Sequence, residues 1–154
     1  MSEKNIRFQI AKISELGFFY KNHKLVPEFA EGESPEGLSA GLNLNYSWNI
    51  EKNIFAIQVE LKFAIEKNTK EKFELLTHTS VTAFLVNDLS TILKVKEHDD
   101  FSIPEKWEIT FVSLAISTAR GMMASRTAGT FYEKFIFPVI DPAQVVLSKR
   151  LKQN

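Results

Sequence analysis

The stretch from Leu42 to Ile65, LNLNYSWNIEKNIFAIQVELKFAI, contains the clearest periodic pattern in this sequence. Apolar and polar side chains alternate on both sides of the polar turn 51–53. Alternation with a period of two places the apolar side chains on one face of a β-strand, and a short turn joins antiparallel neighbours. The stretch therefore predicts a β-hairpin with one buried face.

Two further segments extend this hairpin into a sheet. Residues 73–86 follow a polar turn and are rich in threonine and apolar side chains, which favours a third strand. Residues 6–10 alternate in a first strand, and the change of phase before Ile13 predicts a bulge. The glycine, proline and serine residues of 27–41 predict a loop. Short polar turns between successive strands favour antiparallel pairing, so we predict a four-stranded antiparallel meander.

Residues 104–129 predict a long helix. Apolar side chains recur at intervals of three or four on one side, and these are Trp107, Phe111, Leu114, Ala115, Thr118 and Met122. A second apolar set occupies the opposite side and consists of Ile109, Val112, Ile116 and Met123. Arg126 suits the last turn and Gly129 suits a left-handed position just beyond it. Because the helix is apolar nearly all round, we expect a subunit partner to cover its second side.

The remaining segments complete an α+β domain. Residues 88–105 predict a connector with one helical turn, and residues 130–141 predict an extended apolar segment. Asp141 as cap and Pro142 in the first turn predict a C-terminal helix packed on the sheet. In that helix we expect Val145, Val146 and Leu151 to face inward and Lys149, Arg150 and Lys152 to face water. We expect one domain over residues 1–154.

The composition is that of a soluble globular protein, with 44% hydrophobic and 25% charged residues. Nineteen basic and nineteen acidic residues balance, which argues against nucleic acid and anionic membranes as partners. No apolar run approaches the roughly 20 residues of a membrane span, and residues 1–13 lack a signal-peptide pattern. We therefore expect a cytoplasmic protein without membrane insertion.

Residues able to carry chemistry are sparse. His23, His78 and His98 are far apart, and none has the i,i+4 partner of a paired metal site. His98 stands beside the acidic pair 99–100, a pattern more typical of a solvated charge cluster than of a metal site. The sequence contains no cysteine, no G-x-S-x-G elbow and no phosphate-binding glycine loop. We expect no catalysed reaction, no metal and no cofactor.

Each of two further features allows two interpretations. The chain contains 13 phenylalanines, which either fill the core or remain partly exposed in a groove for a partner. Arg120 lies on the apolar helix, where a guanidinium needs acceptors. It either pairs with a carboxylate or with carbonyl groups and fixes a subunit contact, or it binds the anion of a client or substrate.

The second half of the chain resembles the SecB family of export chaperones. The resemblance rests on residues 113–130, SLAISTARGMMASRTAGT, followed by residues 137–142, FPVIDP. In that family a long helix with an Ala-Arg pair ends in a Ser-Arg-Gly-Thr-type turn, and an apolar segment leads to a last helix. Residues 8–19 are similar to the family's opening strand, so the resemblance spans about Phe8 to Val146.

The resemblance implies a tetramer made of two dimers and an ATP-independent function in protein transport. SecB-type proteins hold unfolded preproteins in apolar grooves and deliver them to the export motor SecA. The matching positions for such a groove are Leu42, Leu44, Tyr46 and Phe131. The alternative for each of these residues is ordinary core packing.

Two features depart from the family pattern, and one other class of protein competes with it. Family members engage SecA through an acidic sheet face and a distinctive tail, whereas residues 58–62 mix charges and residues 149–154 are short and basic. This argues against SecA and leaves open a SecB-like adaptor that serves another client, such as a toxin–antitoxin pair. A hotdog-like small-ligand enzyme is the other alternative. Residues 111–129 lack the Asp, Glu, Asn, Gln or His that such an enzyme needs on its helix.

Overall fold

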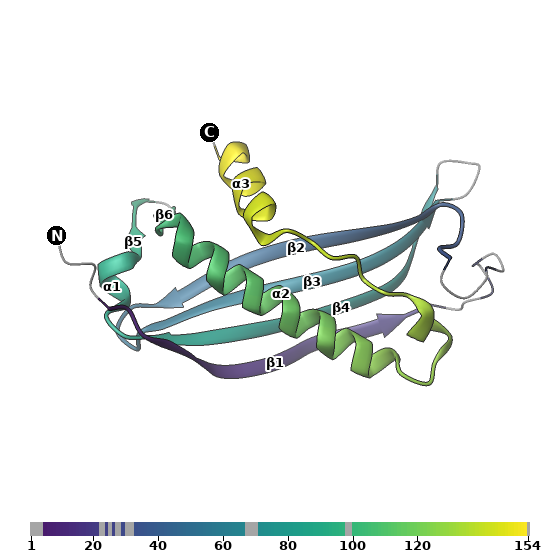
Figure 1. Ribbon diagram of the computed structural model, residues 1–154, viewed down its shortest axis with the longest axis horizontal. Coiled ribbons are helices and arrows are strands. Elements are labelled where there is room, and N and C mark those ends of the chain that lie inside the picture. The colour runs from purple at the N-terminus through teal and green to yellow at the C-terminus, as the bar shows by residue number, and fades with distance from the viewer. Residues whose placement is uncertain are drawn as a thin grey trace.

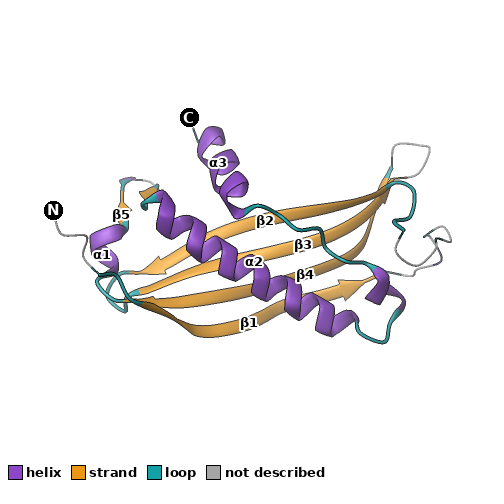
Figure 2. Cartoon of the chain, in the orientation of Figure 1, coloured by secondary structure: helices purple, strands orange, loops and turns teal. Residues whose placement is uncertain are grey.

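The protein consists of an antiparallel sheet with its helices on one face (Figures 1 and 2). The computed structural model describes residues 5–21, 24, 26, 29, 33–66, 71–97 and 100–153. The four main strands are β1 (Phe8–Tyr20), β2 (Leu38–Asn49), β3 (Ile54–Glu66) and β4 (Lys72–Val86). Their spatial order is β1-β4-β3-β2, and all pairs are antiparallel.

This topology confirms the predicted α+β class with a four-stranded antiparallel sheet. β2, β3 and β4 form a meander of successive antiparallel neighbours, as the alternation predicts. β1 differs from a simple meander because it pairs with β4 and not with β2. β1 and β2 are consequently the two edge strands of the sheet.

Strand boundaries differ from the prediction in two places. β1 runs without interruption through 13 residues, with register shifts between Ile10 and Lys12 and between Glu15 and Gly17. The first of these shifts is the predicted bulge, and the second lies further along the same continuous strand. β2 begins at Leu38, four residues before the predicted strand, because Leu38 already pairs with Ile65.

The connector after β4 contains α1 (Leu89–Ile92), the predicted helical turn, and a small hairpin of β5 (Lys94–Val95) and β6 (Phe101–Ser102). The long helix is α2 (Glu105–Thr127), within one or two residues of its predicted ends. Gly129 has a φ of 76°, the left-handed conformation expected beyond the helix. No helix among these described segments is long and apolar enough to cross a membrane.

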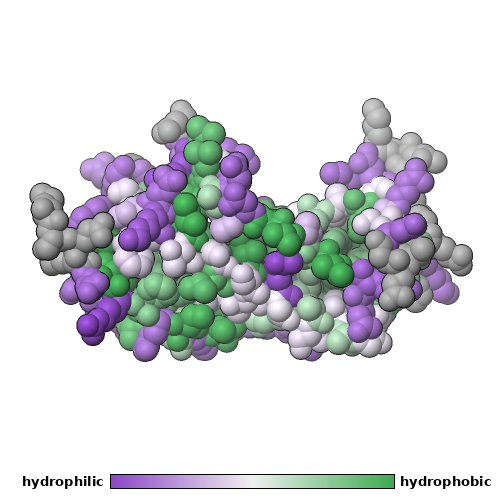
Figure 3. Space-filling view, in the orientation of Figure 1, coloured by the Kyte–Doolittle hydropathy of each residue, from purple (hydrophilic) through white to green (hydrophobic). Residues whose placement is uncertain are grey.

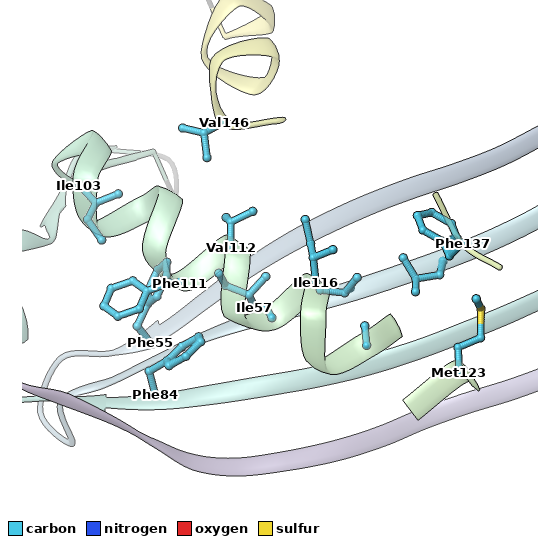
Figure 4. Packing of buried hydrophobic residues seen from close by; sticks show 14 of the residues in the cluster. Phe55, Ile57, Phe84, Ile103, Phe111, Val112, Ile116, Met123, Phe137 and Val146 are labelled. Atoms are coloured by element: carbon cyan, nitrogen blue, oxygen red, sulfur yellow. The ribbon is translucent and has the colours of Figure 1, made fainter. Parts of the chain in front are cut away.

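The core lies between α2 and the inward faces of β3 and β4. Phe111 of α2 packs on Phe84 and Phe55, with ring centroids 4.8 and 5.5 Å apart (Figure 4). The buried stripe of α2 combines members of both predicted sides and consists of Glu108, Phe111, Val112, Ala115, Ile116, Ala119, Met123 and Thr127. The predicted division of the apolar side chains into two faces was therefore wrong. The buried stripe runs between the two predicted faces and takes residues from both.

The chain after α2 first forms a short 3₁₀ helix, η3 (Phe131–Lys134), which corrects the expectation of an extended segment from residue 130. Thr130 caps η3, and the Tyr132 hydroxyl donates to the Lys21 carbonyl at the end of β1. Residues 135–141 then lead without regular structure to α3 (Pro142–Lys152). The Asp141 side chain accepts from the Ala143 amide at 2.9 Å, as its predicted role as cap requires.

Candidate functional site

Strand β2 presents apolar side chains that α2 does not cover. Leu42, Leu44, Tyr46 and Trp48 pair with inward residues of β3 and therefore share the helix-side face of the sheet. A helix about 10 Å wide covers about two strands spaced roughly 4.8 Å apart, and α2 lies on β3 and β4. The side chains of β2 consequently remain half-buried.

Helix α3 and Phe101 form the opposite wall and turn this face of β2 into a groove. One depression of about 510 Å³ is lined by Leu44, Asn45, Tyr46, Ser47, Trp48, Phe101 and Lys149. A second of about 450 Å³ is lined by Leu42, Asn43, Leu44, Ile140, Gln144, Val145, Ser148, Lys149 and Lys152. The two share Leu44 and Lys149 and so adjoin. We call them together the β2–α3 groove.

Aromatic rings form one end of this groove. Phe101 of β6 lies 4.9 Å from the Trp48 ring and 5.4 Å from the Tyr46 ring, measured between centroids. Tyr46 also packs on the core residue Phe55 at 5.5 Å. Aromatic groups in such contacts hold their positions while leaving apolar area for a ligand.

A buried carboxylate joins the walls of the groove. Glu108 of α2 is only 4% exposed. Its Oε1 accepts from the Tyr46 hydroxyl at 2.9 Å, and its Oε2 accepts from Arg150 Nη2 at 2.6 Å and Nε at 3.1 Å. Arg150 also donates to the Ile103 carbonyl at 2.8 Å. The carboxylate thereby ties β2, α2 and α3 together, and burial together with Glu108 raises the pKa of Tyr46.

Lys149 lies inside the groove. Its Nζ is 3.2 Å from the centroid of the Tyr46 ring and 5.9 Å from that of Phe101. Burial lowers the pKa of Lys149, and the nearby Glu108 charge opposes this shift. A cation over aromatic faces is attracted by the ring quadrupoles.

These positions correct the expected orientation of α3. Lys149 and Arg150 turn toward the groove and Glu108 instead of water, whereas Leu151 is 67% exposed. Val146 is buried as expected and points toward Val112 of α2 (Figure 4). The reason is that a buried carboxylate on α2 needs a cationic partner, and the long stem of an arginine can pack on apolar groups while its head reaches that partner.

The structure brings together three of the four predicted groove residues. Leu42, Leu44 and Tyr46 line the β2–α3 groove. Phe131 does not join them, because η3 lies at the end of the sheet opposite α1, where Phe131 packs on Phe29 and Phe135 (Figure 1). Further apolar side chains gather over α2 and the segment leading to α3 (Figure 3), and Ile136 and Val139 of that segment are exposed.

Sequence reasoning missed Lys149, Trp48 and Phe101, which line the groove, and Glu108, which lies behind its wall. For Glu108 a signal existed, since it lies three and four residues before the apolar positions 111 and 112 of the buried stripe. For Lys149 none existed, because the helical period alone does not place α3 against β2.

The remaining candidates outside the groove have structural partners. Arg120 Nη2 donates to the Phe137 carbonyl at 3.1 Å, which agrees with the carbonyl-pairing alternative. His78 is buried, with Nε2 3.1 Å from Glu15 Oε2, and Glu15 also pairs with Arg126. The rest of the inward face of β4 includes Ser80 and Thr82, whose buried hydroxyls have no hydrogen-bond partner among the described residues.

The described residues contain no cluster of three or more potential metal ligands. His23, His98 and Asp99 lie outside the described residues, so the predicted solvated cluster at 98–100 stays a prediction.

Fold and groove define an α+β protein with a groove between the edge strand β2 and the C-terminal helix α3. No family model and no curated protein matches the chain. Among solved structures, it is similar to the Mycobacterium tuberculosis SecB-like chaperone Rv1957 in complex with a ChAD peptide from the Rv1956 HigA1 antitoxin. The identity is 13%, the TM-score is 0.45, and the match covers 86% of this chain and 87% of that chain.

Proposed function

We propose that this protein is an ATP-independent chaperone that binds unfolded or precursor polypeptides in the β2–α3 groove and catalyses no reaction. The observation that carries the proposal is the row of half-buried apolar side chains along β2 facing the open groove, with Leu42, Leu44 and Tyr46 as binding residues. Phe131 contributes from the separate aromatic cluster at η3 in this proposal.

The physical basis is mass action. A surface that binds unfolded chains but not folded ones lowers the concentration of free unfolded chain, and with it aggregation. Leucine and aromatic side chains suit this purpose because they offer contact area without requiring particular polar partners. The groove therefore favours many clients that share exposed apolar residues.

The proposal includes one domain over residues 1–154, a cytoplasmic location and a homo-oligomer arranged as a dimer of dimers. It does not include delivery to SecA. On the open face of the sheet, Glu60 is paired with Lys62 at 3.1 Å and accepts from Asn43 at 3.0 Å. The Asn43 bond, followed by Lys62, lowers the pKa of Glu60, although burial opposes this. This part of the face thus offers a neutralised pair instead of an acidic docking surface.

The test compares two asparagine substitutions on β2. We expect the wild-type protein at stoichiometric amounts to suppress light scattering by a slow-folding precursor without ATP. Leu44→Asn removes apolar area from the centre of the groove, worth about 1–2 kcal/mol, and should weaken this effect roughly tenfold. Ser39→Asn, at an exposed β2 position that does not line the groove, is the matched control and should behave as wild type.

Two results would refute the proposed function. One is a wild-type protein that neither suppresses aggregation nor delays refolding of the precursor. The other is an equal loss in both variants, each shown by circular dichroism to be folded, because such a loss would not depend on the groove.

A further inference from the structure

We propose that the β2–α3 groove prefers extended polypeptide segments that carry a carboxylate side chain between apolar residues, and that Lys149 binds this carboxylate. The inference rests on the proposed function and names the client chemistry that the groove selects. Three features carry it: the unneutralised charge of Lys149, the charge of the groove and the position of Lys149 within it.

Lys149 is a cation without an anionic partner. Its Nζ faces the Tyr46 and Phe101 rings, and none of the described carboxylates forms an ion pair with it. The negative charge of Glu108 acts on Lys149 from nearby. The Glu108 carboxylate accepts from Tyr46 and forms its ion pair with Arg150, so its charge is already neutralised by a cation other than Lys149.

The groove as a whole is positively charged. Among the described residues that line it, the charged ones are Lys149 and Lys152, and no carboxylate lines it. Arg150 neutralises Glu108 behind the wall. An apolar surface with a partly desolvated cation is complementary to a ligand that combines apolar groups with one negative charge.

The position of Lys149 along the groove determines where in the bound segment the carboxylate must lie. Lys149 and Leu44 line both depressions, so Lys149 lies at their junction. From Leu42 to Trp48 the strand advances six residues, roughly 20 Å, which an extended segment of similar length would span. A central carboxylate with apolar residues before and after it therefore matches the order of groups along the groove.

The titration of Lys149 gives the inference a pH signature. Burial lowers the pKa of Lys149, so its charge is lost at a lower pH than that of an exposed lysine. A bound carboxylate favours the charged form. The preference for the acidic segment should consequently fall as pH rises through the pKa of Lys149, while binding of a neutral segment should not follow this change.

The experiment uses calorimetric titration of the full-length protein with two nine-residue peptides. Both peptides are acetylated at the N-terminus and amidated at the C-terminus, and both carry leucine and phenylalanine on either side of the central residue. The central residue is Glu in one peptide and Gln in the matched peptide. We expect the Glu peptide to bind wild type about tenfold more tightly, as a charge-assisted contact allows. Lys149→Gln should lower this ratio to about one, whereas Lys149→Arg should keep a preference for Glu because it retains a cation.

The matched control is Lys72→Gln, which removes the same charge from an exposed position at the start of β4 and should keep the full preference. Equal affinity of wild type for both peptides, or a preference that persists in Lys149→Gln, would overturn this inference alone. Failure of wild type to bind either peptide would overturn it together with the proposed function. Peptide affinity that falls as protein concentration rises would assign the groove to a second copy of the chain and also overturn it.

Discussion

Glu108 is the residue on which the geometry of the groove depends most. Its carboxylate bonds to Tyr46 of β2 and Arg150 of α3 from the first turn of α2. There the positive end of the helix dipole also favours a negative charge. Because its two partners come from the two elements that line the groove on either side, this one side chain ties β2 and α3 to α2 and fixes their relative position.

We predict that Glu108→Gln lowers the free energy of unfolding by about 2 kcal/mol, because it leaves the charge of Arg150 without its partner. The value is below that of a fully buried pair, since the Arg150 side chain is 38% exposed and solvent screens its charge. Urea unfolding of Glu108→Gln, Arg150→Gln and the double variant measures the coupling, which should be about 1 kcal/mol or more.

Glu105→Gln serves as the control for this cycle, because Glu105 lies in the same first turn but is exposed. Its effect on the free energy of unfolding should stay within about 0.5 kcal/mol. Additive effects of the Glu108 and Arg150 substitutions would contradict a direct contribution of the pair.

At the residue scale, the sequence predicts side chains whose position follows from a strand period. Leu42, Leu44 and Tyr46 were expected on one face and lie there, because alternation along a strand leaves no other arrangement. Lys149 and Arg150 were expected in water and lie in the groove and against Glu108. Their positions depend on where a separate helix packs, which no local pattern encodes.

At the scale of elements, Gly121 within α2 and Gly129 just beyond its end should respond oppositely to the same substitution. Gly129 ends the helix at a φ of 76°, where an alanine is strained, so Gly129→Ala should cost about 1 kcal/mol of unfolding free energy. Gly121 lies within the helix, and an added Cβ meets nothing within 4 Å. Gly121→Ala should therefore stabilise by about 0.5–1 kcal/mol.

Thermal and urea unfolding of the two alanine variants measures this difference directly. A stabilising Gly129→Ala would contradict the left-handed turn beyond α2. A destabilising Gly121→Ala would show that the space beside Gly121, which is open in the single chain, is occupied in solution.

Element type was predictable and element placement less so. The caps and the 3.6-residue period fixed α2 and α3, and alternation fixed β2, β3 and β4. The pairing of β1 with β4 could not be predicted from local pattern. The sequence between β1 and β2 contains no signal that says at which edge of the sheet each of these two strands lies. The buried stripe of α2 lies at a different angle around the helix from the predicted faces. The reason is that apolar residues on nearly every side of a helix give only a weak periodic pattern.

At the scale of the whole molecule, edge strand β1 carries exposed apolar side chains. Ile10, Ile13 and Leu16 are 42%, 45% and 58% exposed. Contiguous exposed apolar side chains on an edge strand are typical of a surface for association. They support the proposed oligomer, and we propose that β1 forms one of its contacts.

We predict that native mass spectrometry finds a multiple of the 17.6 kDa chain, and that Ile13→Lys shifts it toward the monomer. A lysine at this position would place a desolvated charge in the contact. Leu147→Lys on α3 is the matched control, because Leu147 is 48% exposed and does not line the groove, and it should leave the mass unchanged. A monomeric wild type would refute both the oligomer and the expected cover of α2.

The width of α2 has a consequence for how such a protein could lose its groove. A single long helix lies over the two central strands, so the flanking strips of the same sheet keep apolar side chains that this helix does not cover. The groove beside β2 thus exists because α2 is too narrow to cover the whole sheet, and it does not require a specialised cavity. A second helix of about fourteen residues, roughly 20 Å long, laid along β2 would close the layer. The same sheet would then be an ordinary two-layer core with no place for a client.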